Sequence, residues 1–280
     1  AEMRDLLDLA MQKRLRWFLT QAHAVGLEVP NARQPDDAAR FAAQYAGLSS
    51  PVIDKIRSRG YWQVVIRPQA FVRERLPKLT DLYPQVRNAA VSLRGWNYPQ
   101  ASSEPDVSYG ADSISLPSEW SNHIEHWSFY QSAQFLDWAA FSLDWIDQAD
   151  HLGPWKDHYS RIQPETILNI TDTVHRFTEI FEFAARLALD MALPMEDPVH
   201  ITITLNRLAG RQLVFIDSQR ALMHSYITQA PDYPCIRVLS HEELVADGRR
   251  IALEEVGKLF ERFGWNPEMG VLQSIQSELK

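Results

Sequence analysis

The chain has 280 residues, of which 45% are hydrophobic and nine are tryptophan. This length allows one large domain or two small ones, and it suffices to bury a core rich in aromatic side chains. The formal net charge of −8 argues against general binding to nucleic acid or to an anionic membrane surface, because both repel an acidic protein.

Cysteine content and hydropathy restrict the cellular setting. The single cysteine, Cys235, excludes an internal disulfide and fits a reducing compartment. No apolar run reaches the roughly 18–20 residues that a membrane-spanning helix needs, and no signal peptide is present. We therefore expect a cytoplasmic protein without a membrane partner.

The N-terminal part has a helical pattern. Leucine and phenylalanine recur at helical spacing over residues 1–25, a linker follows, and a short helix is expected over residues 36–45. We predict that residues 1–50 form an N-terminal helical segment with its linker, and that residues 51–280 form the core domain.

Strands are predicted from β-branched, aromatic and alternating stretches. The stretches 199–205 (VHITITL) and 211–217 (RQLVFID), separated by a turn at Asn206–Gly210, are expected to pair as a hairpin. The remaining predicted strands are residues 61–68 (YWQVVIRP), 90–99 (AVSLRGWNYP), 114–120 (ISLPSEW) and 235–240 (CIRVLS).

A central hairpin is predicted within residues 123–142 (HIEHWSFYQSAQFLDWAAFS), folded about Ser132 and Ala133. A two-residue loop would pair Trp127 with Trp138 and place both on one apolar face. Such loops need a residue with positive φ and favour glycine or asparagine. Because Ser-Ala supplies neither, a longer loop is the alternative.

The strongest helical pattern opens at Pro164 and runs to about Met191. Its apolar stripe is predicted to cover the face that carries Trp127 and Trp138. One or two further helices are expected after residue 240, ending at Gly264. We therefore predict an α+β fold, in which a mostly antiparallel twisted sheet of six to eight strands packs against this long central helix and the terminal helices.

Four stretches together resemble a known protein region: RSRGYWQVVIRP, AVSLRGWNYP, EHWSFYQSAQF and LFERFGW. They are similar to the region that follows the AlbA-type (Schlafen-like) domain in some bacterial regulators and ATP-binding proteins. The similarity spans most of residues 55–265 and consists of structural motifs, although such proteins often have glycine where this chain has Ala133. It implies a cytoplasmic sensor or accessory module that works beside another domain, and it transfers no catalytic residue.

Polar residues on the predicted hairpin form the first candidate site. In the two-residue-loop register His126, Ser128, Tyr130 and Asp137 share one face, with Ser128 opposite Asp137. Histidine, serine and aspartate are the members of a hydrolase triad, but no strained nucleophile turn accompanies Ser128. We therefore interpret this face as a ligand platform or a polar sheet face.

Arg67 and Arg94 form the second candidate site, since each lies near the end of a predicted strand. If the strands were neighbours, the two guanidinium groups would clamp a phosphate or carboxylate. Salt bridges to Glu74 or Asp81 are the alternative. No glycine-rich phosphate loop occurs in the chain.

A metal site would have to come from the acidic, histidine-containing connection. His123, Glu125 and His126 precede a series of aspartates and histidines, but their spacing matches no zinc pattern. A solvated acidic loop is the simpler interpretation, and we predict no metal ligand. That series is Asp144, Asp147, Asp150, His151, Asp157 and His158.

The favoured function is a non-catalytic sensor or interaction module of a bacterial regulatory or defence system. It would bind a small anionic ligand or a partner domain, with no cofactor identified. One alternative is a metal-dependent hydrolase acting on a nucleotide or phosphate ester. Another is a structural module that forms homo-oligomers or docks its first helix on a neighbouring domain.

Overall fold

The structure of the chain is a computed structural model that describes residues 34–101, 104–149, 162–190, 197–216 and 220–279. The chain divides into two compact units, residues 1–43 and 44–280. Helix α2 (Gln34–Tyr45) accounts for the described residues of the first unit. The helix predicted over residues 1–25 lies outside the described residues, and the predicted boundary at residue 50 stays a prediction.

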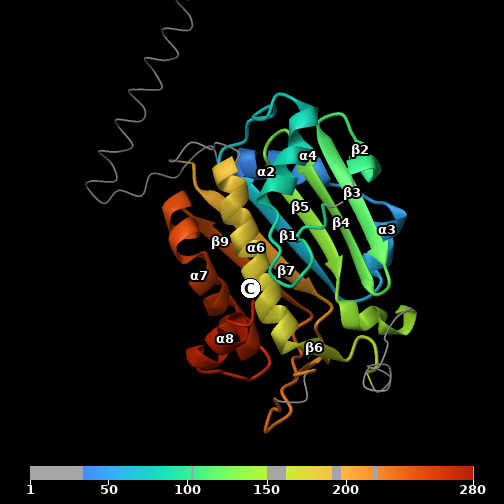
Figure 1. Cartoon of the computed structure of the whole chain (residues 1–280), viewed down its shortest axis with the longest axis vertical. Coiled ribbons are helices and arrows are strands. Elements are labelled where there is room, and N and C mark those ends of the chain that lie inside the picture. The colour runs from blue at the N-terminus through green and yellow to red at the C-terminus, as the bar shows by residue number, and fades with distance from the viewer. Residues whose placement is uncertain (1–33, 102–103, 150–161, 191–196, 217–219, 280) are drawn as a thin grey trace, which may run out of the picture. The chain divides into compact units, whose positions relative to one another are not determined.

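The second unit contains a seven-stranded sheet in which every neighbouring pair is antiparallel (Figure 1). The strand order is β2-β3-β4-β5-β1-β7-β9, which confirms the predicted α+β class and strand number. The strands are β1 (Tyr61–Pro68), β2 (Ser108–Tyr109), β3 (Ser113–Trp120), β4 (His123–Tyr130), β5 (Phe135–Ala140), β7 (Val199–Asn206) and β9 (Asp232–Leu239).

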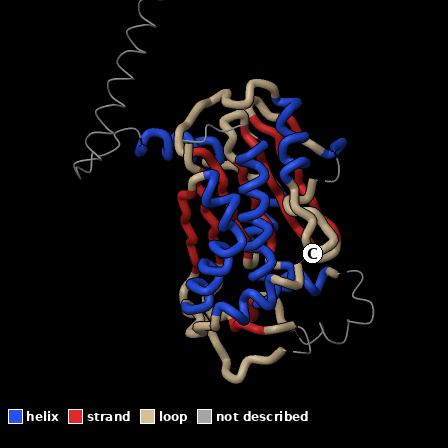
Figure 2. The backbone as a smooth tube through the Cα atoms, turned by 60° about the vertical axis from the view of Figure 1, so that its left-hand side comes forward, coloured by secondary structure: helices blue, strands red, loops and turns tan. Residues whose placement is uncertain are grey.

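Helices α4 (Leu82–Ala89), α6 (Ile170–Asp190), α7 (His241–Glu261) and α8 (Met269–Gln276) cover one face of this sheet (Figures 1 and 2). Helix α6 contacts three other helices, and together they close the main core. The helices of the second unit are α3 (Pro51–Arg57), α4 (Leu82–Ala89), α6 (Ile170–Asp190), α7 (His241–Glu261) and α8 (Met269–Gln276), with 3₁₀ turns at Leu79–Asp81, Glu104–Asp106 and Ser142–Gln148. Within the described residues, no helix is long and apolar enough to cross a membrane.

Two hydrophobic clusters lie on opposite faces of the sheet. Even-numbered residues of β1, such as Trp62 and Val64, point toward α6 and meet Phe177 in the main core. Odd-numbered residues point the other way, so that Val65 packs with Ile53 of α3. Alternation along a strand produces this division, and each large side chain so buried contributes about 1.5–3 kcal/mol to stability.

The central hairpin has the longer of the two loops considered. Ala133 adopts φ +67°, its N–H donates to the carbonyl of Tyr130 (2.9 Å), and the N–H of Tyr130 donates to the carbonyl of Gln134 (2.9 Å). This is a three-residue loop that ends in a left-handed residue. The left-handed conformation costs an alanine about 1 kcal/mol, which burial of Ala133 in the main core offsets.

The extra loop residue shifts the register by one, so the predicted pairing is wrong. Trp127 lies opposite Asp137, and His126 lies opposite Trp138. Trp127 therefore faces α6, whereas Trp138 lies in the cluster beside α3. Helix α6 covers the first tryptophan, as predicted, but not the second.

The second predicted hairpin does not form. Strand β7 pairs with β1 and β9, while β8 (Gln212–Val214) pairs in parallel with the short β6 (Ile167–Asn169). Arg211 explains the difference, because its guanidinium group is fully buried and donates to Asp144 over 2.8 and 2.5 Å. Arg211 Nη1 also donates to the carbonyl of Ile167 (2.9 Å), which holds β8 beside β6.

Gly60 permits this buried ion pair. A Cβ atom at Gly60 would lie 2.2 Å from Arg211 Nη2, 2.4 Å from a ring carbon of Phe141 and 2.7 Å from Asp144 Oδ2. The N–H of Gly60 also donates to Asp144 (2.8 Å). A side chain at this position is therefore incompatible with the observed packing.

Residues 90–99 form a loop rather than the predicted strand. A single bridge joins Val91 to Tyr98, and Gly95 between them adopts φ +87°. Arg94 forms ion pairs with two carboxylates on α6. These ion pairs hold the loop against the helix instead of in the sheet.

Helix α6 begins at Ile170 rather than at Pro164. Glu165 adopts φ +66°, and residues 167–169 extend as β6. The side chain of Asn169 accepts a hydrogen bond from the N–H of Thr171 (3.2 Å). Asparagine caps a helix in this way, so the helix begins immediately after it.

Candidate functional site

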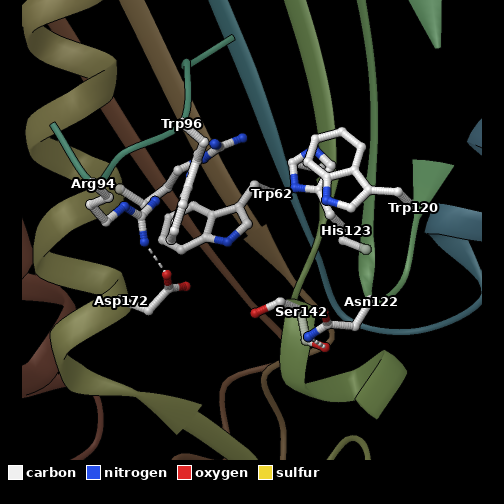
Figure 3. Close-up of a pocket in the computed structure, with 11 residues that line it drawn as sticks. Trp62, Arg94, Trp96, Trp120, Asn122, His123, Ser142 and Asp172 are labelled. Atoms are coloured by element: carbon white, nitrogen blue, oxygen red, sulfur yellow. Dashed lines mark hydrogen bonds and ion pairs between the residues drawn. The ribbon is translucent and has the colours of Figure 1, made fainter. Parts of the chain in front are cut away.

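A pocket of about 310 Å³ opens beside the first residues of β1, the last residues of β5 and the first turn of α6 (Figure 3). The loop 90–99 and the turn between β3 and β4 complete its walls. Ligand pockets span about 300 to 1,000 Å³, so this cavity suits a small molecule. Its lining residues are Trp62, Arg94, Trp96, Trp120, Asn122, His123, Ala139, Ala140, Ser142, Asp172 and Arg176.

Three tryptophans give the pocket its aromatic character. Trp62 is 2% exposed, whereas Trp96 and Trp120 are 47% and 44% exposed. Figure 3 shows the last two on opposite sides of the space, with Trp62 overlapping Trp96 in this view. Exposed indoles at the rim of a cavity are available to contact a ligand.

The turn between β3 and β4 presents Trp120 and His123 as a pair. Ser121 adopts φ +51°, and the two flanking residues are directly opposite each other in the strand register. Their rings stack with centroids 3.9 Å apart and 24° between the planes. This contact fixes the orientation of the imidazole on the pocket wall.

Arg94 is held on the wall of the pocket by two acids of α6. Its guanidinium group donates to Glu179 through Nε (2.8 Å) and Nη2 (2.6 Å), and to Asp172 through Nη1. The same group lies over the ring of Trp96, 4.9 Å from its centroid. The acids therefore compensate its charge, and Arg94 in turn supports Trp96.

Arg176 occupies a second, more deeply buried ion cluster. Its Nη2 lies 3.0 Å from Asp137 and 3.4 Å from Glu125, and its guanidinium carbon lies 4.0 Å from the ring centroid of Tyr98. Both carboxyl groups are fully buried. One arginine thus forms ion pairs with two acids immediately behind the pocket.

The two acids differ in protonation. Burial raises the pKa of Asp137 well above its ordinary value, and the neighbouring charge of Glu125 adds to this effect. Burial also opposes ionisation of Glu125, but a hydrogen bond from His123, the charge of Arg176 and the N–H of Gln100 hold its pKa below the ordinary value. Of the two acids, Asp137 is therefore the one that holds a proton more strongly, and Glu125 is the one that ionises more readily.

His123 connects this cluster to the pocket. Its Nε2 lies 3.3 Å from Glu125, and the N–H of Gln100 donates to the same carboxylate oxygen (3.0 Å). A carboxylate-oriented imidazole can transfer protons. Among the described residues, however, no serine, threonine or cysteine is hydrogen-bonded to His123. These residues therefore do not form a nucleophile–histidine–carboxylate triad.

The polar hairpin residues lie on both faces of the sheet. His126, Ser128 and Tyr130 are buried on the face away from α6, whereas Asp137 points toward α6. Ser128 lies opposite Leu136, not Asp137. The predicted common face of four residues is therefore wrong, and burial lowers the pKa of His126 to about 4.

Arg67 and Arg94 are not neighbours. Arg67 is an odd-numbered residue of β1, directly opposite His200 of β7, and points away from α6. Arg94 bonds to α6 on the other side of the sheet. The clamp that would need both guanidinium groups is not formed, and Arg94 alone lines the pocket.

Among the described residues, no group of three His, Cys, Asp or Glu side chains is placed to hold a metal ion. Asp144, one of the candidate ligands, instead bonds Arg211. Asp150, His151, Asp157 and His158 lie outside the described residues.

Sequence reasoning did not identify the pocket as a site. The signal available was the pair Trp120 and His123 flanking a two-residue polar turn, a spacing that makes them cross-strand neighbours. Trp96 gave no comparable signal, because its position depends on a loop held by Arg94.

Comparisons of the chain with protein-family models, with curated proteins and with solved structures return no match.

Proposed function

We propose that this protein is a non-catalytic ligand-binding module, and that the tryptophan pocket is its binding site. The observation that carries the proposal is the pairing of two half-exposed rim indoles, Trp96 and Trp120, with a buried third indole, Trp62. Aromatic surface that stays exposed at a concave site is the usual mark of ligand recognition.

The pocket is pre-organised, which favours binding. Arg94 is fixed by Asp172 and Glu179, and His123 is fixed between Trp120 and Glu125. A ligand that enters such a pocket does not have to order these side chains, so less of the binding energy is lost to conformational entropy.

Binding is favoured over catalysis because the acids beside the pocket are already engaged. Glu125 and Asp137 both contact Arg176, and the carboxylate of Glu179 receives two hydrogen bonds from Arg94. General acid–base catalysis needs a group free to reach the reacting atoms.

The test is a fragment screen by thermal shift and calorimetry, with neutral, cationic and anionic compounds. A compound that binds the folded state raises the unfolding midpoint by mass action. We expect Trp96→Ala and Trp120→Ala each to weaken binding about tenfold, because loss of one stacking contact costs on the order of 1–3 kcal/mol.

Tyr109→Ala is the matched control, since Tyr109 is an exposed aromatic residue outside the pocket lining. It should bind as the wild-type protein does. Wild-type affinity in both tryptophan variants would contradict the assignment of the site.

A further inference from the structure

We infer that the ligand of the tryptophan pocket is an organic cation, a protonated or quaternary amine. The inference rests on the proposed function and specifies the chemical class of its ligand. Two independent features of the described residues support it: the aromatic faces around the cavity, and an unbalanced set of charges behind it.

The aromatic faces are suited to a cation. Trp62, Trp96 and Trp120 line one cavity of about 310 Å³, and the indole face attracts positive charge more strongly than the other aromatic rings do. Trp96 already shows this preference, because the guanidinium group of Arg94 lies 4.9 Å from its centroid.

The charges behind the pocket are not balanced. Arg94 contacts the two acids Asp172 and Glu179, and Arg176 contacts the two acids Glu125 and Asp137. Two arginines therefore face four acids. The acids outnumber the arginines, even with His123 as a further contact of Glu125, and a ligand cation would supply additional positive charge.

Asp172 places part of this negative charge at the pocket. Its side chain is 36% exposed, against 0% for Glu179, and it lines the cavity. One carboxylate oxygen accepts from Arg94. The group is therefore positioned to face a cation held between the indoles.

An anion is disfavoured by the same arrangement. Nε, Nη1 and Nη2 of Arg94 all donate to carboxylates already, and Nη2 of Arg176 is shared by two acids. An anion would add to the excess negative charge, and it would have to compete with bonds that are intramolecular. This replaces the small anionic ligand expected from the sequence.

The experiment compares three probes of one shape by calorimetry on the full chain. Choline carries the cation, 3,3-dimethylbutan-1-ol is its uncharged carbon isostere, and 3,3-dimethylbutanoate carries a negative charge. We expect choline to bind about tenfold more tightly than the alcohol, since a cation–π contact in a partly desolvated site is worth on the order of 1–2 kcal/mol. We expect the carboxylate to bind most weakly.

Asp172→Asn tests the charge directly. It should weaken choline about threefold or more and leave the affinity for the alcohol unchanged. Asp247→Asn is the matched control, because Asp247 is likewise an exposed aspartate paired with an arginine but lies outside the pocket. It should change neither affinity, and thermal unfolding checks that both variants fold.

The outcomes separate the inference from the proposed function. Equal or tighter binding of the alcohol or the carboxylate would overturn the preference for a cation and leave the pocket as a ligand site. Failure of all three probes to bind at millimolar concentration would also overturn the inference, and the fragment screen would then decide the proposed function independently. Equal loss of choline affinity in Asp172→Asn and Asp247→Asn would exclude a specific role for Asp172.

Discussion

The buried pair Glu125 and Asp137 allows a quantitative test of the ion cluster behind the pocket. Replacing Arg176 with methionine removes the one cation that both acids contact, at 3.4 and 3.0 Å. Removal of one partner of a buried ion pair costs about 3–5 kcal/mol, because the remaining charge is left desolvated. Asp137→Asn should instead cost less than about 1 kcal/mol at pH 7, since the amide resembles the neutral carboxyl group.

The pH dependence of the free energy of unfolding tests the protonation of Asp137 independently. The pKa of Asp137 is raised above its ordinary value of 3.8, so the folded state holds a proton that the unfolded state releases as the pH rises. Wild-type stability therefore falls with pH through this window, whereas the asparagine variant has no such loss. The stability of Asp137→Asn relative to wild type should rise by up to about 1.4 kcal/mol per pH unit above pH 4.

Urea denaturation measured from pH 4 to pH 8 tests both statements, because its midpoints give the free energy of unfolding at each pH. Arg250→Met is the control for loss of an exposed arginine, and it should cost less than about 1 kcal/mol, since the side chain of Arg250 is 56% exposed. If Asp137→Asn were as destabilising as Arg176→Met at pH 7, Asp137 would be ionised and the assigned protonation would be wrong.

Three further changes test other parts of the fold. Gly60→Ala should destabilise the protein by more than about 3 kcal/mol through overpacking, whereas Gly270→Ala, where nothing lies within 4 Å of the added Cβ, should be neutral or slightly stabilising in thermal unfolding. Ser240→Ala removes the capping box at the start of α7 and should lower the free energy of unfolding by about 1 kcal/mol in urea; no change would contradict the capping role. The pKa of His126 is lowered to about 4, so its imidazole stays neutral in the folded state while it becomes protonated in the unfolded state as the pH falls. His126→Leu should therefore lose less stability than the wild-type protein between pH 7 and pH 4.5, by up to about 3 kcal/mol. Parallel pH profiles of the two proteins would refute this.

The sequence pattern predicted the elements whose structure depends mainly on their own residues. Residues 61–68 form β1 as predicted, because the run of aromatic and β-branched side chains suits a central strand. The long helix was predicted from its apolar stripe, but it begins six residues later than predicted. There the capping by Asn169 determines the start more strongly than a proline five residues earlier.

Features that depend on distant residues were not predictable in the same way. The hairpin register depends on Ala133 adopting φ +67°, which alanine rarely does. The loop 90–99 lacks a strand because Arg94 reaches acids of α6, about 80 residues later in the chain. Since the pocket is built on that loop, it could be recognised only in three dimensions.

The most direct test of the central claim is a titration followed through the indole N–H resonances of the ¹⁵N-labelled protein. Each of the nine tryptophans gives one resonance, which substitution of each tryptophan by phenylalanine assigns. We expect a bound ligand to shift the resonances of Trp62, Trp96 and Trp120 together. The resonances of Trp127 and Trp138, which are fully buried elsewhere in the sheet, should stay in place. A ligand that binds while those three resonances stay unchanged would show that the pocket is not the binding site.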